Sequence, residues 1–567
     1  MKKILLTLVC LFLAGIGSGQ EIYLETLSVR SSSFPAHKSI FTITRQDIGN
    51  STATNIADLL SRYGIATIQR RGAFGLSGDI SILGTTFDQG IIKVNGLIVN
   101  DPQTGHHNLD IPVPLESIER IEITPQAINI ITIKQPLTRF KLDLLGGQHR
   151  LWGGTLAINN ITYQHLASSG WRDNTEFNND TWYYQLRVPS SKRISIITFG
   201  YERKDFGAYR FYSQNFPAEK EKTSTLLASG QTEYYTGLWH WQPQGSFRLH
   251  RDYFILDRDR PDWSFNDHRN STIFLGLPVT LPIKQHKLIA GFDFKQEAIN
   301  SSNLQQHHRN TYSCSTRFLP QLNAPWQMEL GLREDWYAPA PVRRVFRPAI
   351  EMDYGLSENW SWQTGLNRFY RLPTLTELYY KDPANQGSIS LDAEKGWDYH
   401  IGVKYESDKI SWQNIVLWRN IINAIDWTKY SGETIWQARN ISTISAYGLD
   451  SAFVFNTIIK VHYQYLNHHS ASGNYLSKYN TNFLKHHASL HCSYTLPGQI
   501  KNDWVAAYRK PSQLSPYTLL DLKISRPFSH NLTIYISGTN LLNTYYEEIA
   551  GIPLPGRWLL LGLQYQH

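Results

Sequence analysis

Apolar and polar residues alternate through most of this 567-residue chain, and this period of two restricts its fold more than any other feature. Near residue 400 the alternating apolar residues are Tyr399, Ile401, Val403 and Tyr405, and near the end of the chain they are Leu559, Leu561, Leu563 and Tyr565. Successive side chains of a strand point to opposite faces, so each run predicts a strand with one apolar face. We find neither the buried-core runs nor the linkers of separate soluble β-domains. The pattern therefore predicts one large barrel over residues 136–567.

The composition agrees with a barrel that spans a membrane. The chain has 32 Tyr and 17 Trp but only 3 Met and 3 Cys, and side chains with an apolar body and a polar tip suit the boundary between lipid and water. Beyond the N-terminus, no segment approaches the roughly 18 consecutive apolar residues of a membrane helix. We therefore expect a membrane β-barrel of about 22 antiparallel strands, wide enough to hold a small domain in its lumen.

The N-terminus resembles a cleavable secretory signal over residues 1–19. Lys2 and Lys3 precede an apolar run, which small residues then follow. Without these two lysines the net charge is about +6, and its distribution does not suggest a nucleic-acid partner. Two cysteines remain after cleavage, Cys314 and Cys492, and whether they pair is left open.

A short extended segment follows the signal, within residues 20–37. An extended strand with free edges can be captured by another protein through main-chain hydrogen bonds. The run Glu25, Thr26, Leu27, Ser28 and Val29 resembles a TonB box, the peptide by which outer-membrane receptors engage the energy-transducing protein TonB. This resemblance implies that the five residues couple the protein to TonB.

Residues 38–135 show the mixed pattern of a small α/β domain. We expect a helix capped near Ser51 or Thr52 that runs through Ile56, Leu59 and Leu60, and short strands at 40–44, 66–69, 80–83, 91–94 and 118–123. Gly84 and Gly96 are expected at turns. The segments IADLLSRYGIATIQRRG, DISILGTTFDQGIIKVNGLIVND and PLESIERIEI resemble the plug domain of TonB-dependent outer-membrane receptors. Unlike most of that family, the chain passes almost directly from Ile123 to Ile131, with about ten residues fewer.

The barrel region carries further motifs of the same family. RLPTLTELYY, LDAEKGWDYHIGVKY and the C-terminal segment SGTNLLNTYYEEIAGIPLPGRWLLLGLQYQH resemble its recurring barrel motifs, although His567 replaces the usual terminal aromatic residue. The resemblance covers Glu25 to His567. It implies a receptor in the outer membrane of a Gram-negative bacterium that imports a small-molecule ligand. Its partners would be the lipid bilayer and TonB with the inner-membrane energising complex, while a surface lipoprotein is left open.

Two outward plug loops, 69–77 and 100–108, are the predicted ligand site. The candidate ligand-binding residues are Gln69, Arg70, Arg71, Phe74, Asn100, Asp101, Gln103, His106 and His107. The short barrel and the region around IDW and WQARNI look most like receptors of the cobalamin type. A ferric siderophore or haem importer is the alternative. A passive porin or a structural barrel is less favoured, because neither needs a plug and a TonB box.

The sequence does not favour an enzyme. It contains no Ser-centred elbow, phosphate loop or zinc-protease motif. Histidines occur as adjacent pairs such as His106 and His107; neighbours on a strand point to opposite faces and cannot share an ion, and in a loop such a pair is more often polar filler than a metal site. We therefore predict no catalytic residues, no cofactor and no metal site. Segments 205–223, 296–310 and 467–479 are predicted to be longer extracellular loops.

Overall fold

The computed structural model describes residues 39–134, 140–190, 193–339, 344–441, 443–470, 474–479 and 483–567. The predicted signal segment and the run Glu25 to Val29 lie outside the described residues. Among the described residues, none of the helices has the length and apolar character needed to cross a membrane.

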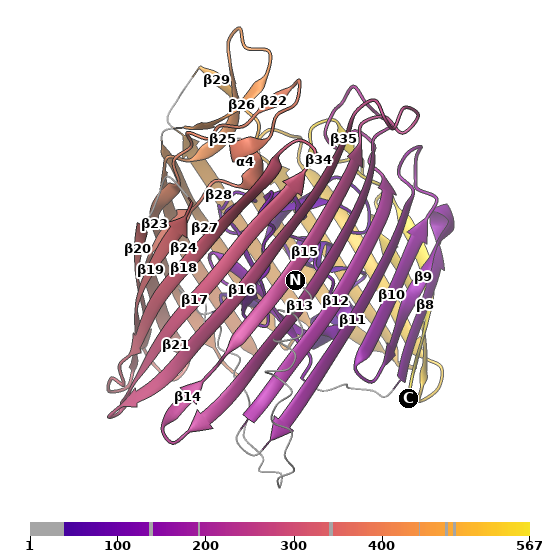
Figure 1. Cartoon of the computed structure of the whole chain (residues 1–567). Helices are drawn as coiled ribbons and strands as arrows, with labels where there is room; N and C mark the ends of the chain where they lie inside the picture. The colour runs from indigo at the N-terminus through magenta and orange to yellow at the C-terminus, as the bar shows by residue number, and fades with distance from the viewer. Residues whose placement is uncertain are drawn as a thin grey trace.

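A closed barrel of twenty-two long antiparallel strands dominates the molecule (Figure 1). In chain order the wall strands are β8 (Phe140–Gly147), β9 (Leu151–Ile158), β10 (Ile161–Ser168), β11 (Phe177–Ser190), β12 (Arg193–Gly207), β13 (Lys220–Thr236), β15 (Gln244–Ile255), β16 (Phe265–Ile283), β17 (His286–Ser301), β18 (Gln305–Leu319), β19 (Trp326–Ala338), β20 (Arg344–Gly355), β21 (Trp360–Arg371), β23 (Glu394–Glu406), β24 (Ile410–Ile422), β27 (Thr443–Phe455), β28 (Ile459–Ser470), β30 (Leu484–Leu496), β31 (Ile500–Pro511), β32 (Tyr517–Pro527), β33 (Leu532–Thr539) and β36 (Trp558–Gln566). The short β14 (Trp239–Trp241) pairs with β13 and β16, as β15 does, so it is an interrupted piece of the same strand. The last strand, β36, pairs with the first, β8, and closes the wall.

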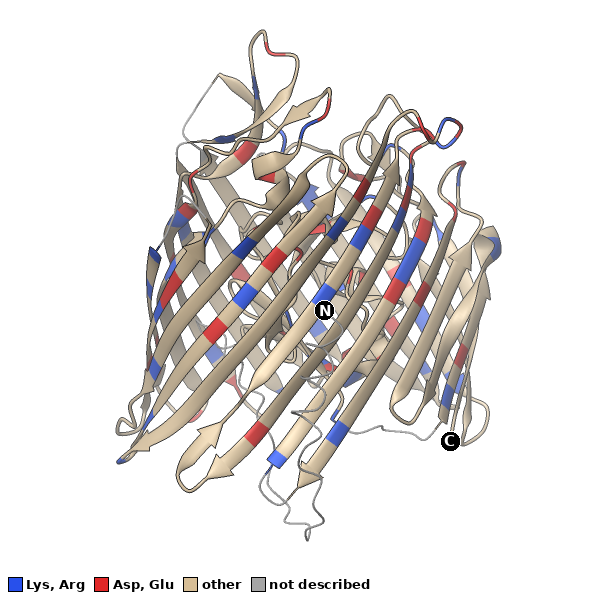
Figure 2. Ribbon diagram, in the orientation of Figure 1, with Lys and Arg blue, Asp and Glu red and all other residues tan. Residues whose placement is uncertain are grey.

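The alternation seen in the sequence separates the two faces of the wall. On β23 the side chains of Trp397, Tyr399 and Ile401 are exposed on the outer face, and those of Asp398 and His400 are buried in the lumen. Figure 2 marks Lys, Arg, Asp and Glu at many positions along the wall strands. Several of these charged side chains are buried, among them Lys204, Arg248 and Asp252, so they face the lumen. The predicted barrel is confirmed.

The connections differ in length between the two ends of the barrel. One rim, uppermost in Figure 1, carries α4 (Leu375–Tyr379) and a four-stranded sheet in the order β22 (Asn385–Gln386), β26 (Trp436–Asn440), β25 (Ile425–Tyr430) and β29 (Tyr475–Ser477). The hairpin of β34 (Glu547–Ile549) and β35 (Ile552–Pro553) lies at the same rim. The rim is therefore a roof built from connections distant in sequence.

The predicted loop at 296–310 is wrong. β17 continues to Ser301 and β18 begins at Gln305, so only three residues connect them. The polar composition of this segment was misleading because strands of such barrels continue beyond the apolar band, where polar side chains are not a signal that a strand ends. The connection between β12 and β13, residues 208–219, does lie within the predicted loop 205–223. Cys314 and Cys492 are both free thiols.

The N-terminal domain lies inside the barrel, where it appears in indigo in Figure 1. Its five-stranded sheet has the order β1 (Phe41–Thr44), β6 (Ile118–Ile123), β7 (Ala127–Thr132), β4 (Ile91–Val94) and β5 (Leu97–Ile98), with β4 and β7 parallel. A hairpin of β2 (Thr67–Arg70) and β3 (Gly78–Ser81), the helices α2 (Arg45–Asn50) and α3 (Ile56–Tyr63), and the short 3₁₀ helices η1 (Gly105–His107) and η2 (Leu115–Ser117) complete it. A further 3₁₀ turn, η3 (Gln148–Arg150), joins β8 to β9 in the wall. The predicted plug fold is confirmed.

Local sequence explains most of these boundaries. Asn55 caps α3, because its side-chain oxygen accepts a hydrogen bond from the backbone N–H of Asp58 at 2.9 Å. The cap predicted at Ser51 or Thr52 is wrong, since Ser51 instead ends the unforeseen helix α2. Gly84 and Gly96 have positive φ angles, as expected for turns.

Two features bring the plug against the wall. Gly64 ends α3 with φ of 69°, and a Cβ atom there would lie only 1.3 Å from the ring of His487, so no larger residue fits. The connection between β6 and β7 has only three residues and is closed by a hydrogen bond from Thr124 N–H to the Ala127 carbonyl. The direct passage expected after Ile123 is therefore confirmed. In this turn the Gln126 amide donates to Asp398 of the wall.

Candidate ligand site at the plug apex

The two predicted loops, 69–77 and 100–108, lie at the end of the plug nearest the roof. Arg70 contacts Tyr546 and Glu548 in the connection between β33 and β36. The carbonyls of Pro102 and Gln103 accept hydrogen bonds from the backbone N–H groups of Leu375 and Thr376, at the start of α4. We call this end of the plug the apex.

An ion pair with a histidine lies at the centre of the apex. The Arg71 guanidinium donates to both oxygens of Asp79 at 2.8 and 2.7 Å, and His106 Nδ1 donates to Asp79 Oδ1 at 2.6 Å. Burial by itself would raise the pKa of Asp79, but Arg71 and His106 outweigh burial and hold this pKa well below its usual value. The three side chains therefore join the two loops through an ionised carboxylate.

Aromatic rings surround His106 and form the aromatic apex, made of Phe87, His106, Tyr212 and Tyr479. The Phe87 and His106 rings are stacked with centroids 4.6 Å apart, and the Tyr479 ring lies 5.7 Å from His106. Tyr212 comes from the connection 208–219 and also lies under the Arg71 guanidinium. Sequence reasoning missed the roles of both tyrosines, although each lies within a predicted loop.

Loop 69–77 reaches towards the roof and the upper wall. The Arg70 guanidinium donates to Glu548 at 2.7 Å, and Arg509 of β31 donates to the same carboxylate at 2.8 Å. Phe74 packs on Phe177 and Trp558, with ring centroids 5.5 and 4.9 Å away. Gln69 is half-buried on β2, where it pairs with Asp79 across the hairpin.

Loop 100–108 is anchored to the plug and to the wall. Asn100 accepts a hydrogen bond from Ile92 N–H at 2.9 Å and donates to the Gly90 carbonyl. Asp101 accepts from Arg248 at 2.5 Å and from Asn270 at 3.1 Å, and Gln103 accepts from the same Asn270 amide. Of the predicted residues in this loop, Asn100, Asp101 and Gln103 therefore support the loop, while His106 belongs to the aromatic apex.

His107 points away from His106 and is buried against the wall. Its Nδ1 lies 3.0 Å from Asp110, and its Nε2 lies 3.5 Å from Asp252 on β15. Burial by itself would lower the pKa of His107, but these two carboxylates raise it well above the usual value. Lys204 of β12 donates to the other oxygen of Asp110 at 2.6 Å.

Beside loop 69–77 little open space separates the plug from the barrel wall. A cavity of about 60 Å³ lies between α3, loop 69–77 and the strands near β31 and β32. This volume holds only a few water molecules, whereas sites for small-molecule ligands have about 300 to 1,000 Å³. A ligand that crosses the barrel along this side therefore requires the plug to move.

A wall closed on itself, a plug within it and an apex beneath a roof of long connections define a gated transport receptor. Residues 137–541 match the family model described as TonB dependent receptor-like, beta-barrel, and residues 34–129 match the TonB-dependent receptor plug domain. The chain belongs to the TonB-dependent receptor family. These proteins are nutrient-import receptors, not enzymes, and they interact with TonB and with small-molecule ligands; the family implies an outer-membrane barrel.

Relatives of known structure or function agree with this assignment. The vitamin B12 transporter BtuB of Vibrio vulnificus (strain CMCP6) is 19% identical over an alignment 577 positions long, which covers 92% of this chain and 91% of that protein. A mutant form of the ferric enterobactin receptor PfeA of Pseudomonas aeruginosa superposes with a TM-score of 0.74 at 14% identity, and the match covers 96% of this chain and 100% of that chain. The FrpB iron transporter of Neisseria meningitidis gives a TM-score of 0.76 at 14% identity over 94% of this chain and 99% of that chain. These structural similarities establish the fold.

Proposed function

We propose that this receptor binds a corrinoid of the cobalamin type at the plug apex and imports it across the outer membrane of a Gram-negative bacterium. The observation that carries this choice is the neutralisation of both apical arginines. Arg71 is paired with Asp79, and Arg70 is paired with Glu548. The apex thus offers polar groups and aromatic rings with little net positive charge from these arginines.

The ligand classes differ in the charge that a site must balance. Ferric catecholate siderophores and haem carry negative charge, and their recognition favours unpaired Arg or Lys side chains. A corrinoid presents an apolar macrocycle with a rim of neutral amide groups, which suit aromatic faces and uncharged hydrogen-bond partners. The aromatic apex of Phe87, His106, Tyr212 and Tyr479 supports the corrinoid. The similarity to BtuB supports the same choice.

A ligand screen tests the cargo. Purified receptor is titrated with cyanocobalamin, haemin and ferric enterobactin, and binding is followed by tryptophan fluorescence and calorimetry. We expect saturable one-to-one binding of cyanocobalamin and at least tenfold weaker binding of the other two. Tight binding of haemin or ferric enterobactin without cobalamin binding would contradict the cargo and leave the receptor class intact.

We further propose that Glu25, Thr26, Leu27, Ser28 and Val29 couple import to TonB. An extended peptide pairs with a partner strand through main-chain N–H groups, and proline removes one such donor. Deletion of residues 25–29, or Thr26→Pro, is therefore expected to abolish energised uptake while ligand binding stays within twofold of wild type. A matched control replaces Ser31, Ser32 and Ser33 with alanine and keeps uptake.

Two measurements test the TonB coupling and distinguish the receptor from a passive porin. Uptake that is undiminished in the deletion variant would contradict the coupling. A passive porin would give a steady open conductance in planar bilayers, whereas a plugged receptor is expected to remain closed until the plug is perturbed by denaturant.

A further inference from the structure

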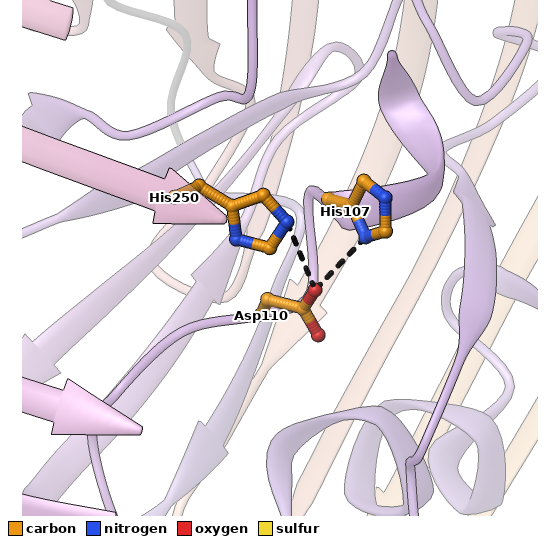
Figure 3. Close-up of side chains that lie close together, drawn as sticks. All are labelled: His107, Asp110 and His250. Atoms are coloured by element: carbon orange, nitrogen blue, oxygen red, sulfur yellow. Dashed lines mark hydrogen bonds and ion pairs between the residues drawn. The ribbon is translucent and has the colours of Figure 1, made fainter. Parts of the chain in front are cut away.

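A cluster of histidine and carboxylate side chains joins the plug to the wall beside the apex. His107 of η1 and Asp110 belong to the plug, and His250 belongs to β15 (Figure 3). Asp110 Oδ2 lies 3.0 Å from His107 Nδ1 and 3.9 Å from His250 Nε2. Each of the three side chains is more than nine-tenths buried, and the one ligand atom that each contributes lies within 4.8 Å of the others.

One nitrogen of this cluster is buried without a hydrogen-bond partner among the described residues. This atom is His250 Nε2, on a side chain that is 0% exposed. The other ring nitrogen, Nδ1, lies 2.8 Å from the Thr225 hydroxyl. The Thr225 hydroxyl can donate to Nδ1 or accept from it, and in the tautomer with the proton on Nδ1 the lone pair of Nε2 faces the Asp110 carboxylate. Two acceptors that face each other in a buried site are unfavourable unless a cation lies between them.

His107 and Asp110 each have a second partner on the side away from the centre of the cluster. His107 Nε2 lies 3.5 Å from Asp252, so this carboxylate orients the ring, and a metal ion at the centre of the cluster would replace the Nδ1 proton that Asp110 Oδ2 accepts. Lys204 donates to Asp110 Oδ1, which leaves Oδ2 for the centre. Carboxylate or hydroxyl partners behind each histidine are the usual supports of metal ligands, since they fix the tautomer and the orientation of the ring.

We propose that His107, Asp110 and His250 bind a divalent transition-metal ion of the zinc class, which clasps the plug to the barrel wall. Two imidazole nitrogens and one carboxylate oxygen are a donor set typical of Zn²⁺, with water in the fourth position. Calcium and magnesium prefer oxygen donors alone.

The spacing fits this ion with small adjustments. Ligand atoms of a tetrahedral site with bonds of about 2.0 to 2.1 Å lie about 3.3 Å apart. The observed separations from Asp110 Oδ2, 3.0 and 3.9 Å, fall on either side of that value. Because two ligands come from the plug and one from β15, the bound ion links two parts of the chain that are otherwise joined by non-covalent contacts.

A second group, His107, Glu221 and Asp252, lies on the other side of the His107 ring. It offers one nitrogen and two carboxylates, and its Asp252 already supports His107 from behind. The first group is favoured because it contains the unpartnered His250 Nε2. The proposal does not depend on which ligand the receptor imports.

The test uses the full-length receptor, stripped with EDTA in detergent and titrated with Co²⁺ and Zn²⁺. We expect a visible Co²⁺ absorption band that saturates at one ion per chain, is displaced by Zn²⁺, and is accompanied by a higher unfolding temperature. His250→Gln and Asp110→Asn are expected to lose the band or to weaken Co²⁺ binding by at least 100-fold. Asp252→Asn, which removes the support behind His107, is expected to weaken binding by about 10- to 100-fold.

The matched control is His487→Gln. His487 is also a buried wall histidine that faces the plug, with Nδ1 2.9 Å from the Gly64 carbonyl. Its Nε2 likewise has no partner among the described side chains. This variant is expected to keep the Co²⁺ band. Heat-modifiable migration on gels confirms that each variant forms a closed barrel before it is titrated.

Two results would overturn the proposal. The first is Co²⁺ binding by folded His250→Gln and Asp110→Asn with wild-type stoichiometry and affinity. The second is loss of the band in Glu221→Gln with retention in His250→Gln, which would assign the ion to the other group.

Discussion

The two apical loops of the plug form ion pairs with different parts of the barrel. Loop 69–77 is tied to the roof connection through Arg70 and Glu548, whereas loop 100–108 is tied to wall strands through Asp101 and Arg248. The ionised Asp79 joins them through Arg71 and His106. Loop 100–108 also accepts backbone hydrogen bonds from α4 of the roof, so it is held at both the wall and the roof, and we expect it to be the more rigid platform. We expect loop 69–77 to follow changes in the hairpin β34–β35 through Arg70.

The largest expected effect comes from Asp79→Asn, which separates the two loops. The variant leaves the buried Arg71 guanidinium without its carboxylate. Removal of one partner of a buried ion pair costs about 3 to 5 kcal/mol. We expect the free energy of plug unfolding, measured by urea titration with hydrogen exchange, to fall by that amount. Asp267→Asn, in an exposed pair with Arg251, is the control and should cost less than about 1 kcal/mol.

The pH dependence of this effect has a defined sign. The folded-state pKa of Asp79 lies below its usual value, so the ion pair contributes stability above the unfolded pKa of about 3.9 and loses it as pH falls through the folded pKa. The difference in stability between wild type and Asp79→Asn should therefore be constant near neutral pH and shrink below about pH 4. A constant difference down to about pH 2 would contradict this role.

The second prediction concerns the platform. Asp101→Asn removes the charge that Arg248 contacts. Burial by itself would raise the pKa of Asp101, but Arg248 keeps this pKa at about 2. We expect a loss of about 2 to 3 kcal/mol in stability and faster hydrogen exchange over loop 100–108. In the double variant with Arg248→Gln, the total loss in stability should be smaller than the sum of the losses in the two single variants. Strict additivity would show that the pair does not hold the loop.

A smaller effect is expected for Arg70→Gln. Glu548 keeps its hydrogen bond from Arg509, and Asp58, the other carboxylate near Arg70, keeps one from Asn55, so neither buried carboxylate loses all its partners. The loss in stability should therefore be about 1 kcal/mol. Hydrogen exchange should increase in the hairpin β34–β35 and not in loop 100–108. Equal increases in both regions would remove the distinction between the roof-linked loop and the platform.

The smallest effect on stability is expected at Tyr479. Tyr479→Phe keeps the ring that packs on Phe87 and His106, so stability should change by less than about 0.5 kcal/mol. Cyanocobalamin affinity should stay within twofold in this variant and fall about tenfold in Tyr479→Ala, as expected for loss of one aromatic contact. Unchanged affinity in the alanine variant would place the ligand elsewhere.

The sequence predicted those features of the fold that depend only on local residue patterns. Alternation over residues such as Tyr399, Ile401 and Val403 depends only on the pleat of a strand, and it correctly separated the outer face from the lumen. The contacts of the apex could not be predicted this way. Arg248 and Asp101 are 147 residues apart, and no local signal pairs them.

The histidine pairs show the same limit. The prediction placed His106 and His107 in the outward loop 100–108, and they lie in the 3₁₀ helix η1 within that loop. His106 belongs to the aromatic apex, and His107 faces His250 across the boundary between plug and wall. The spatial partner of His107 is thus on β15, which only the closed barrel reveals. Similarly, the polar residues at 296–310 predicted a loop, but most of them lie in β17 and β18. Composition alone does not distinguish a loop from the part of a strand that extends beyond the membrane.

The seam between β36 and β8 constrains how the molecule assembles. Seven residue pairs, from Leu560 with Gly147 to Gln566 with Lys141, join the last wall strand to the first, and Phe140 and His567 exchange backbone hydrogen bonds beside them. Until β36 is in place, β8 and β33 each keep an open edge that can pair with another chain. We therefore expect closure to be a late event of folding, with the plug enclosed before or during it. A receptor caught earlier would be an open sheet, prone to aggregation and dependent on assembly factors that shield its edges.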